Sequence, residues 1–387
     1  MEVGVDMMKA AYIHIPFCKQ ICHYCDFNKF FLKGQPVEDY LTSLEIEMKN
    51  TLEQYPTQGL TSIFVGGGTP TALDERQLER LLKGIALHLM PLAGDDLEFT
   101  FEANPGDLNE EKLYLLKDAG VNRLSIGVQT FDDVLLERIG RTHRVTDVFK
   151  SIELARSAGF TNLSIDLIYG LPNQSLEQFA STLDTALSLG IEHFSGSALQ
   201  IEPKCVFFNL MREGRLSLPI QETEAAMYEL LMEQMERHGY QQYEISNFSK
   251  QGFESRHNLV YWNNEEYYGF GAGAHSYMQK ARRVNAGPLT HYISKLEESG
   301  FPYVEIHSVP INEQMEEELF LGLRKTAGIN IDYFKDKFKL DLLQIFGKQI
   351  SNLSARELVK IMDNQLVLTH KGKLLGNEVF QAFIGEI

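Results

Sequence analysis

Three cysteines near the start of the chain have the spacing of ligands for an inorganic cluster. Cys18, Cys22 and Cys25 form a C-x3-C-x2-C pattern directly after the apolar run 11–15. An iron–sulfur cluster normally takes four protein thiolates. Three thiolates leave one iron open, and an open iron can bind and activate a small molecule. The spacing therefore predicts a cluster whose free iron carries the chemistry.

A zinc site and a disulfide pair are the alternatives for these cysteines. His23 could complete a zinc site, because Zn²⁺ accepts both histidine nitrogen and thiolate sulfur. Structural zinc loops usually have a second ligand pair farther along, and neither C-x2-C nor H-x3-H follows here. A disulfide scaffold is unusual in a long chain with one further cysteine, Cys205, which we expect to be a buried small side chain. The cluster is the favoured interpretation.

The composition limits the classes of protein to which the chain can belong. Its 387 residues, 44% of them hydrophobic, suffice for two or three domains with a sizeable core. No apolar run reaches the roughly 20 residues that span a bilayer, and residues 1–9 are too short and mixed for a signal peptide. Clustered thiolates favour a reducing cytoplasm. The net charge of −17 argues against nucleic acid as the main partner.

Short apolar runs alternate with helical patterns along most of the chain. Such runs, apolar on both faces, are typical of parallel strands in βα units. The predicted strands are 11–15, 62–65, 98–102, 123–128, 163–168 and 194–200, and the predicted helices are 37–53, 75–89, 109–119, 146–158, 176–188 and 221–238. Six units predict an α/β fold, a partial (β/α)6 barrel of the TIM type, with its chemistry at the carboxyl ends of the strands.

After about Pro302 the pattern changes, so we divide the chain into residues 1–302, the barrel with an extension, and 303–387, a smaller C-terminal domain. Residues 304–310 are predicted as a linker or crossing strand, and 312–324, 355–364 and 377–383 as helices. Residues 366–369 followed by 370–373 indicate a small hairpin or wing. The C-terminal domain is therefore expected to be helical and similar to a winged helix.

The cysteine triplet resembles that of the radical S-adenosylmethionine (SAM) superfamily, in which three cysteines hold a [4Fe–4S] cluster and SAM chelates the fourth iron. Further motifs resemble the oxygen-independent coproporphyrinogen III oxidase family, and within it the haem-chaperone branch. They are Y-I-H-I-P-F-C at 12–18, G-G-G-T-P at 66–70, E-A-N-P at 102–105, S-I-G-V-Q at 125–129, D-L-I-Y-G-L-P at 166–172, Y-E-I-S-N-F at 243–248 and L-G-L-R at 321–324. The resemblance runs over nearly the whole chain and implies a radical SAM barrel.

The resemblance also implies which residues bind SAM. These are Tyr12, Gly67, Gly68, Thr69, Glu102, Gln129, Arg141 and Asp166. Glycines would let the backbone approach the methionine part of SAM, carboxylates suit an ammonium or ribose hydroxyls, and a guanidinium suits a carboxylate. The plainer alternatives are a tight turn for the glycines, helix capping for the carboxylates and a surface position for Arg141.

Two features favour the haem-chaperone branch over the oxidase. The oxidase has a fourth cysteine two residues after the triplet, where this chain has Phe27, and a long N-terminal extension, whereas only a few residues precede the first strand here. The H-N-x-x-Y-W string at 257–262 matches the chaperone branch and implies His257 as the haem ligand, since a neutral imidazole binds haem iron well. The alternative is that His257 is hydrogen-bonded and its aromatic neighbours belong to the core. His275 is the second choice.

These features predict a haem chaperone that binds a [4Fe–4S] cluster, SAM and haem and delivers haem to acceptor proteins such as respiratory cytochromes. A homodimer and peripheral membrane association are further expectations from the resemblance. The alternative is a redox enzyme that decarboxylates the propionates of coproporphyrinogen, so enzymatic activity is left open. A radical SAM enzyme acting on tRNA is disfavoured by the net charge of −17.

Overall fold

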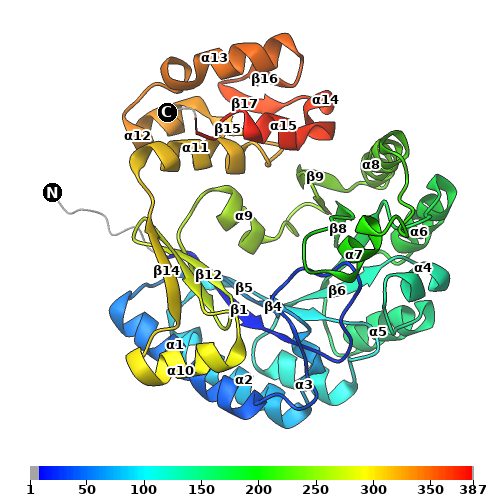
Figure 1. The fold of residues 1–387 in the computed structure, drawn as a ribbon, viewed down its shortest axis with the longest axis vertical. Coiled ribbons are helices and arrows are strands. Elements are labelled where there is room, and N and C mark those ends of the chain that lie inside the picture. Colours follow the sequence, from blue (N-terminus) through cyan, green and yellow to red (C-terminus); the bar gives the residue numbers. More distant parts are fainter. Residues whose placement is uncertain (1–7, 386–387) are drawn as a thin grey trace.

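Six parallel strands form the centre of the protein. The computed structural model describes residues 8–385, and its central strands lie side by side in chain order (Figure 1). They are β1 (Ala10–Ile15), β4 (Leu60–Gly67), β5 (Ala93–Ala103), β6 (Arg123–Gln129), β7 (Asn162–Tyr169) and β8 (His193–Ala198). The helices that follow them are α1 (Val37–Gln54), α2 (Glu75–His88), α3 (Glu110–Asp118), α5 (Val145–Ser157), α6 (Leu176–Ser188) and α8 (Gln221–Arg237). The predicted α/β fold and its six units are confirmed.

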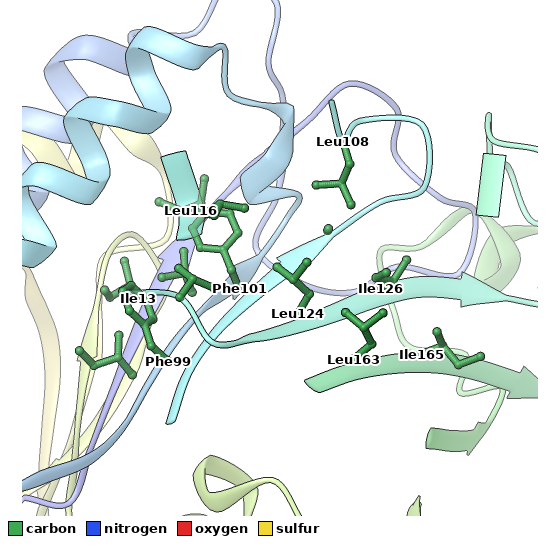
Figure 2. Packing of buried hydrophobic residues seen from close by; sticks show 14 of the residues in the cluster. Ile13, Phe99, Phe101, Leu108, Leu116, Leu124, Ile126, Leu163 and Ile165 are labelled. Carbon is green, nitrogen blue, oxygen red and sulfur yellow. The ribbon is translucent and has the colours of Figure 1, made fainter. Parts of the chain in front are cut away.

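Side chains alternate across each strand, and the outer set packs against the helices. Figure 2 shows Ile13, Phe99, Phe101, Leu124, Ile126, Leu163 and Ile165 in this layer, together with Leu108 and Leu116 from the covering segments. Because successive side chains point to opposite faces, the residues between them face the concave side of the sheet. We call this concave side the barrel interior. It receives the polar residues of the strands, among them Glu102, Ser125 and Asp166.

Local capping fixes where several helices begin. The side chain of Asp74 accepts a hydrogen bond from the backbone N–H of Gln77 at 2.8 Å, and Ser175 does the same for Gln178 at 3.2 Å. In both cases the side-chain oxygen of the glutamine accepts a hydrogen bond from the backbone N–H of the capping residue. Two N–H groups that would otherwise be unpaired are thus satisfied at each helix start. These caps fix the first residues of α2 and α6.

Further strands extend the sheet on both sides, and of these the sequence predicts only the strand at Tyr303–Ser308, as a linker or crossing strand at 304–310. On one side β11 (Tyr267–Phe270) runs parallel to β1, followed by the antiparallel strands β12 (His275–Met278), β13 (Ala281–Asn285) and β14 (Tyr303–Ser308). On the other side β10 (Asn247–Ser249) and β9 (Gln241–Glu244) follow β8 in antiparallel pairing. The twelve-stranded sheet stays open, because β14 and β9 at its two ends do not pair with each other. Helix α10 (Leu289–Ser299) packs on α1.

The C-terminal segment forms a unit with its own core, drawn orange to red in Figure 1. It contains α11 (Ile311–Gly322), α12 (Ile331–Phe338), α13 (Leu342–Ala355), α14 (His370–Leu374), α15 (Gly376–Gln381) and the small sheet of β15 (Ile329–Asn330), β17 (Gln365–Leu368) and β16 (Val359–Met362). The helix predicted at 355–364 is wrong, because this stretch is the end of α13 and strand β16. Asp363 and Asn364, with φ of 50° and 61°, form a tight hairpin turn between β16 and β17.

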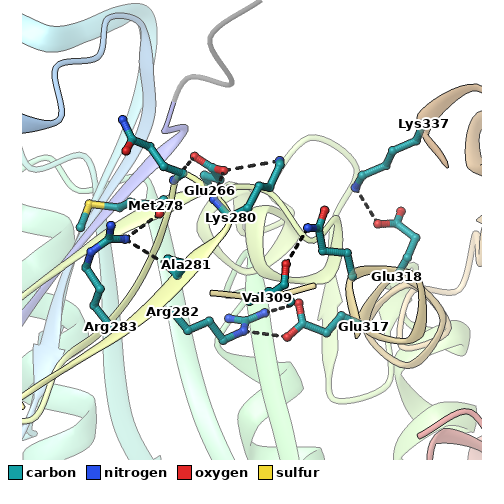
Figure 3. Close-up of polar contacts among 12 residues, drawn as sticks. Glu266, Met278, Lys280, Ala281, Arg282, Arg283, Val309, Glu317, Glu318 and Lys337 are labelled. Carbon is teal, nitrogen blue, oxygen red and sulfur yellow. Dashed lines mark hydrogen bonds and ion pairs between the residues drawn. The ribbon is translucent and has the colours of Figure 1, made fainter. Parts of the chain in front are cut away.

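Charged contacts join the C-terminal unit to the sheet extension (Figure 3). Arg282 on β13 donates two hydrogen bonds, both of 2.7 Å, to the carboxylate of Glu317 on α11. A bidentate pair of this kind fixes both distance and orientation. The backbone adds a further link, since the N–H of Ile245 donates to the carbonyl of Arg324 at 3.0 Å. The unit is thus held over the open side of the barrel.

Across residues 8–385, the structure contains no helix with the length and apolar character needed to cross a membrane.

Candidate functional site

The loop that carries the three cysteines begins at the end of β1. Cys18 ends the short strand β2 (Phe17–Cys18), which pairs with β3 (Phe30–Phe31), and its side chain is buried, whereas Cys22 and Cys25 are partly exposed. His14 holds the far end of the loop, because its Nε2 donates to the carbonyl of Asn28 at 2.7 Å. The ends of the loop are therefore fixed to the barrel, and its cysteines lie over the carboxyl end of the sheet.

His23 fastens the middle of the loop to the barrel wall. Its Nδ1 lies 2.9 Å from the carbonyl oxygen of Arg138, to which it donates, and its ring packs on Phe207 of α7 (Val206–Arg212). Within residues 8–385, no three His, Cys, Asp or Glu side chains converge as ligands of a single metal ion. A four-iron cluster instead offers a separate iron to each thiolate. The donor set of Cys18, Cys22 and Cys25 fits that group.

The cysteines share one cavity of about 360 Å³ with the residues predicted to bind SAM, except Tyr12. The cavity lies at the carboxyl ends of the central strands, where parallel barrels place their chemistry. Its lining includes Cys18, Cys22, Cys25, Gly67, Gly68, Thr69, Glu102, Gln129, Arg141 and Asp166. These residues come from the cysteine loop, from the ends of β4 to β7, and from the loop after α4 (Asp133–Arg138). The structure thus brings together residues that lie up to about 150 positions apart in the sequence.

Glycines at the end of β4 stand where no larger residue fits. Gly67 has φ of 113°, and a Cβ there would come within 2.5 Å of the His14 ring. A Cβ on Gly68 would lie 2.9 Å from the backbone of Phe17. The hydroxyl of Thr69 is 3.7 Å from the Sγ of Cys18, to which it donates. The glycine run therefore lets the cysteine strand and the cavity wall approach each other closely.

Two carboxylates stand inside the cavity on neighbouring parts of the sheet. Glu102 accepts a hydrogen bond from the N–H of Gly67 at 3.0 Å, and Asp166 accepts one from the hydroxyl of Ser125 at 3.2 Å. Burial, and then the charge of Asp166, raise the pKa of Glu102 to about 8. Burial raises the pKa of Asp166 to about 6, against the opposing charge of Arg123. Both groups would be stabilised as anions by a cationic ligand.

Arg141 is held by two hydrogen bonds, and its Nε is left without a partner in the described part of the chain. It donates to the side-chain oxygen of Asn104 at 2.6 Å and to the hydroxyl of Tyr24 at 3.0 Å. Its Nε is enclosed and has no hydrogen-bond partner among the residues that the structure describes. A buried donor of this kind costs free energy unless a ligand or water satisfies it. This orphaned atom fits a carboxylate in the cavity.

Gln129 lines the cavity, whereas Tyr12 lies outside it. Gln129 follows a β-bulge after Gly127 and has φ of 69°, which turns its side chain toward the cavity. Tyr12 does not line the cavity. Its hydroxyl donates to Nδ1 of His14 at 2.9 Å, and its ring packs beside Phe64 in the barrel interior. Tyr12 therefore supports His14, which in turn holds the cysteine loop.

His257 lies away from this cavity, on α9 (Arg256–Trp262) in the concave side of the barrel (Figure 1). The side chain is 1% exposed, and its two nitrogens lie 2.9 Å from Ser62 Oγ and 2.8 Å from the Tyr261 hydroxyl. Burial, and then the charge of Arg123, lower its pKa to about 3, so the imidazole is neutral. Both nitrogens are engaged in this conformation. His275 is exposed on β12 and does not line the cavity either.

Sequence reasoning missed several residues that line or brace the cavity. Asn104 connects Arg141 to the hydroxyl of Thr69, to which its amide donates at 3.1 Å. Its position in the E-A-N-P string at the end of β5 was the available signal. Tyr24, Ser195 and Ser197 also line the cavity, and no pattern in the sequence marked them.

Comparisons with known proteins show which families this chain is similar to. The family model described as "Radical SAM superfamily" matches residues 12–186, and the one described as "HemN C-terminal domain" matches residues 309–375. "Heme chaperone HemW" of Bacillus subtilis (strain 168) is 56% identical over 380 residues, which cover 98% of this chain and 100% of that protein. The protein of the same name from Lactococcus lactis subsp. lactis (strain IL1403) is 44% identical over 97% of both chains.

A solved structure shares the fold over the whole chain. It is described as "Coproporphyrinogen III oxidase (HemN) from Escherichia coli is a Radical SAM enzyme". It superimposes with a TM-score of 0.86 over 100% of this chain and 92% of that chain, at 24% identity. At this identity the likeness shows the fold alone, and it confirms the partial barrel.

Proposed function

Because this chain belongs to the HemW family of haem chaperones, within the radical SAM superfamily, we propose that it binds a [4Fe–4S] cluster, SAM and haem and passes haem to acceptor proteins. Respiratory cytochromes are the proposed acceptors. The proposal includes a cytoplasmic location, with a homodimer and contact with a membrane surface as accompanying hypotheses.

The observation that carries the cofactor part of the proposal is the convergence of three thiols and the SAM-binding motif residues on one cavity. Cys18, Cys22 and Cys25 would hold three irons of the cluster. Such a cluster, when bound, supplies an electron and an open iron to a ligand. The thiols need to be deprotonated to bind iron, and burial raises the pKa of Cys18 to about 11. Metal binding at this site is therefore expected to release protons.

The remaining residues of the cavity suit the parts of SAM. The spare Nε of Arg141 is a donor for the carboxylate of the methionine moiety. Glu102 and Asp166 are acceptors for its ammonium and its ribose hydroxyls. Gly67 and Gly68 remove the side chains that would otherwise occupy the space beside the cysteine strand. These residues bind and orient the ligand.

Haem ligation by His257 would require a change from the described conformation, in which both ring nitrogens have partners. The imidazole is neutral, as an iron ligand must be. It would have to give up its contact with either Ser62 or Tyr261, and α9 would have to expose it. Haem binding through His257 therefore requires a local rearrangement of α9 that exposes the imidazole to haem.

Anaerobic reconstitution tests the cluster. We expect about four irons per chain in the wild type, and a loss of most of this iron on Cys18→Ala, Cys22→Ala or Cys25→Ala. The matched control is Cys205→Ala, which should keep its iron because Cys205 is buried at the start of α7 and does not line the cavity. Iron that persists in all three loop variants would contradict the assignment.

Haem titration tests the chaperone function in the same preparation. We expect a shift of the haem Soret band on binding, followed by transfer of haem to an apo-cytochrome. The absence of both effects, together with anaerobic turnover of coproporphyrinogen in the presence of SAM and a reductant, would favour the oxidase instead.

A further inference from the structure

Like Arg141 in the cavity, Arg123 lies inside the barrel and forms no ion pair within residues 8–385. The side chain of Arg123 is 2% exposed. Its enclosed Nε has no hydrogen-bond partner, and no described carboxylate lies within ion-pairing distance of its guanidinium. A buried cation without a partner is costly. We therefore look for negative charges near Arg123 that could offset this cost.

The sheet places Arg123 directly behind the SAM-binding cavity. Arg123 is two residues before Ser125 on β6 and points to the same interior face. On β5 its partner is Thr100, which is two residues before Glu102 and whose hydroxyl also has no partner among the described residues. On the other side, β7 carries Asp166. Arg123 therefore lies one step deeper in the barrel than the two cavity carboxylates.

Two neutral histidines lie within the electrostatic range of Arg123. His257 is held between Ser62 and Tyr261 as described, and His193 is held in the same way, 2.8 Å from both the Ser164 hydroxyl and the Tyr243 hydroxyl. Burial and the charge of Arg123 lower the pKa of both histidines. Neither imidazole can neutralise a cation. The charge of Arg123 lowers the pKa of two cavity carboxyls, Glu102 and Asp166, against the effect of burial. Glu98, two residues before Thr100 on β5, lies on the same face, but its carboxylate is hydrogen-bonded to the start of α9.

We propose that Arg123 is a positioning residue for SAM, an internal cation that favours the ionised form of Glu102 and Asp166 while leaving their oxygens free for the ligand. This inference rests on the proposed SAM site. A direct ion pair would occupy the carboxylate oxygens, whereas a charge one layer deeper acts through the low-dielectric interior without a hydrogen bond. The arrangement counteracts the burial that favours protonated carboxyls.

The pH dependence of SAM affinity tests the inference. In the reconstituted wild type, affinity should rise with pH through the range of about 6 to 8 in which the two carboxyls ionise. Besides Arg123, the other titratable groups facing them are Tyr12, Tyr261 and Arg141, which do not change charge in this range. The three loop cysteines also line the cavity, and in the reconstituted protein they would be bound to iron. In Arg123→Met, the midpoint should move up by about one pH unit or more, so that affinity near neutral pH falls about tenfold and recovers in alkali.

Three further variants separate a charge effect from a structural one. Arg123→Lys keeps the cation and should keep the wild-type midpoint. Thr100→Asp leaves Arg123 in place but gives it a partner, and should raise the midpoint as Arg123→Met does, even if the methionine variant misfolds. Arg283→Met removes another buried arginine, on β13 and far from the cavity, and should leave the profile unchanged.

The outcomes are distinct. A wild-type midpoint retained in both Arg123→Met and Thr100→Asp, or an equal loss of affinity at every pH, would overturn the role of Arg123 while leaving the SAM site intact. A flat pH profile in a wild type that binds SAM would do the same. A wild type that binds no SAM at any pH would overturn the proposed site, and this inference with it.

Discussion

The guanidinium of Arg324 lies over the indole ring of Trp262, 4.4 Å from the ring centre. Arg324 belongs to the C-terminal unit, and Trp262 ends α9. At the other end of α9, the carboxylate of Glu98 accepts hydrogen bonds from the N–H groups of Arg256 and His257 at 3.0 and 3.2 Å. The helix that carries His257 is thus held between the barrel and the C-terminal unit. Loss of either contact should loosen the packing of α9.

We expect Arg324→Met to loosen the contact between α9 and the C-terminal unit. Losing a partly desolvated cation–π contact should lower the free energy of unfolding by about 1–2 kcal/mol. Trp262 is the single tryptophan of the chain, so its fluorescence should shift to longer wavelength as water reaches the ring. The control is Arg356→Met, which breaks an exposed ion pair with Glu378 and should cost less than about 0.5 kcal/mol. Unchanged fluorescence in Arg324→Met would contradict the contact.

His257→Ala should destabilise the protein even when no haem is present. The change removes a buried ring and leaves the hydroxyls of Ser62 and Tyr261 without their partner. We expect a loss of about 3 kcal/mol in the free energy of unfolding, measured by denaturant titration. His275→Ala, at an exposed position on β12, should change it by less than about 0.5 kcal/mol. Full stability combined with an altered haem spectrum would point to ligation as the main role of His257.

Gly67→Ala should abolish SAM binding. The new methyl group would stand within 2.5 Å of the His14 ring, at a backbone φ of 113° that side chains avoid. Moving His14 would also disturb its bond to Asn28 and with it the cysteine loop. We expect affinity to fall at least about 100-fold in equilibrium binding, because a 1 Å displacement of site groups has effects of this size. Gly347→Ala is the control, since nothing lies within 4 Å of its added methyl. Normal affinity in Gly67→Ala would refute the close packing.

Glu47 on α1 should make stability depend on pH. Its 1%-exposed carboxylate accepts hydrogen bonds from the N–H of Gly271 at 2.8 Å, from the amide of Asn285 at 2.6 Å, and from the Tyr292 hydroxyl. Burial nevertheless raises its pKa to about 7, above the ordinary 4.5. The folded protein therefore keeps a proton that the unfolded chain releases, and stability falls as pH rises from about 4.5 to 7, by roughly 3 kcal/mol.

The comparison with Glu47→Gln isolates this group from the other carboxyls. The variant has no charge to form at this position, so the difference in unfolding free energy between it and the wild type should change with pH across that window. Denaturant titrations at several pH values measure the difference. Two parallel stability curves would show that Glu47 ionises at its ordinary pKa.

Much of the fold could be predicted from local patterns. The strands of the central sheet and the helices beside them are apolar at regular intervals, and these intervals follow directly from strand and helix geometry. Strand β14 was recognised only as a linker or crossing strand, and β9 to β13 were not predicted, because they are short and acquire their role by pairing with distant strands. Residues 355–364 were misassigned because the turn at Asp363 and Asn364 was overlooked.

The site divides in the same way. The cysteine triplet and the motif residues at the strand ends are local features. Parallel strands place their carboxyl ends at one edge, so the meeting of Cys18, Glu102 and Asp166 could be predicted from local patterns alone. Local patterns could not predict that both nitrogens of His257 would be occupied, or that Arg123 would lie unpaired behind the cavity. Those facts depend on how α9 and the C-terminal unit pack into the barrel. Burial and hydrogen bonding of these side chains arise from contacts between segments far apart in the chain, and such contacts are fixed only when the whole chain folds.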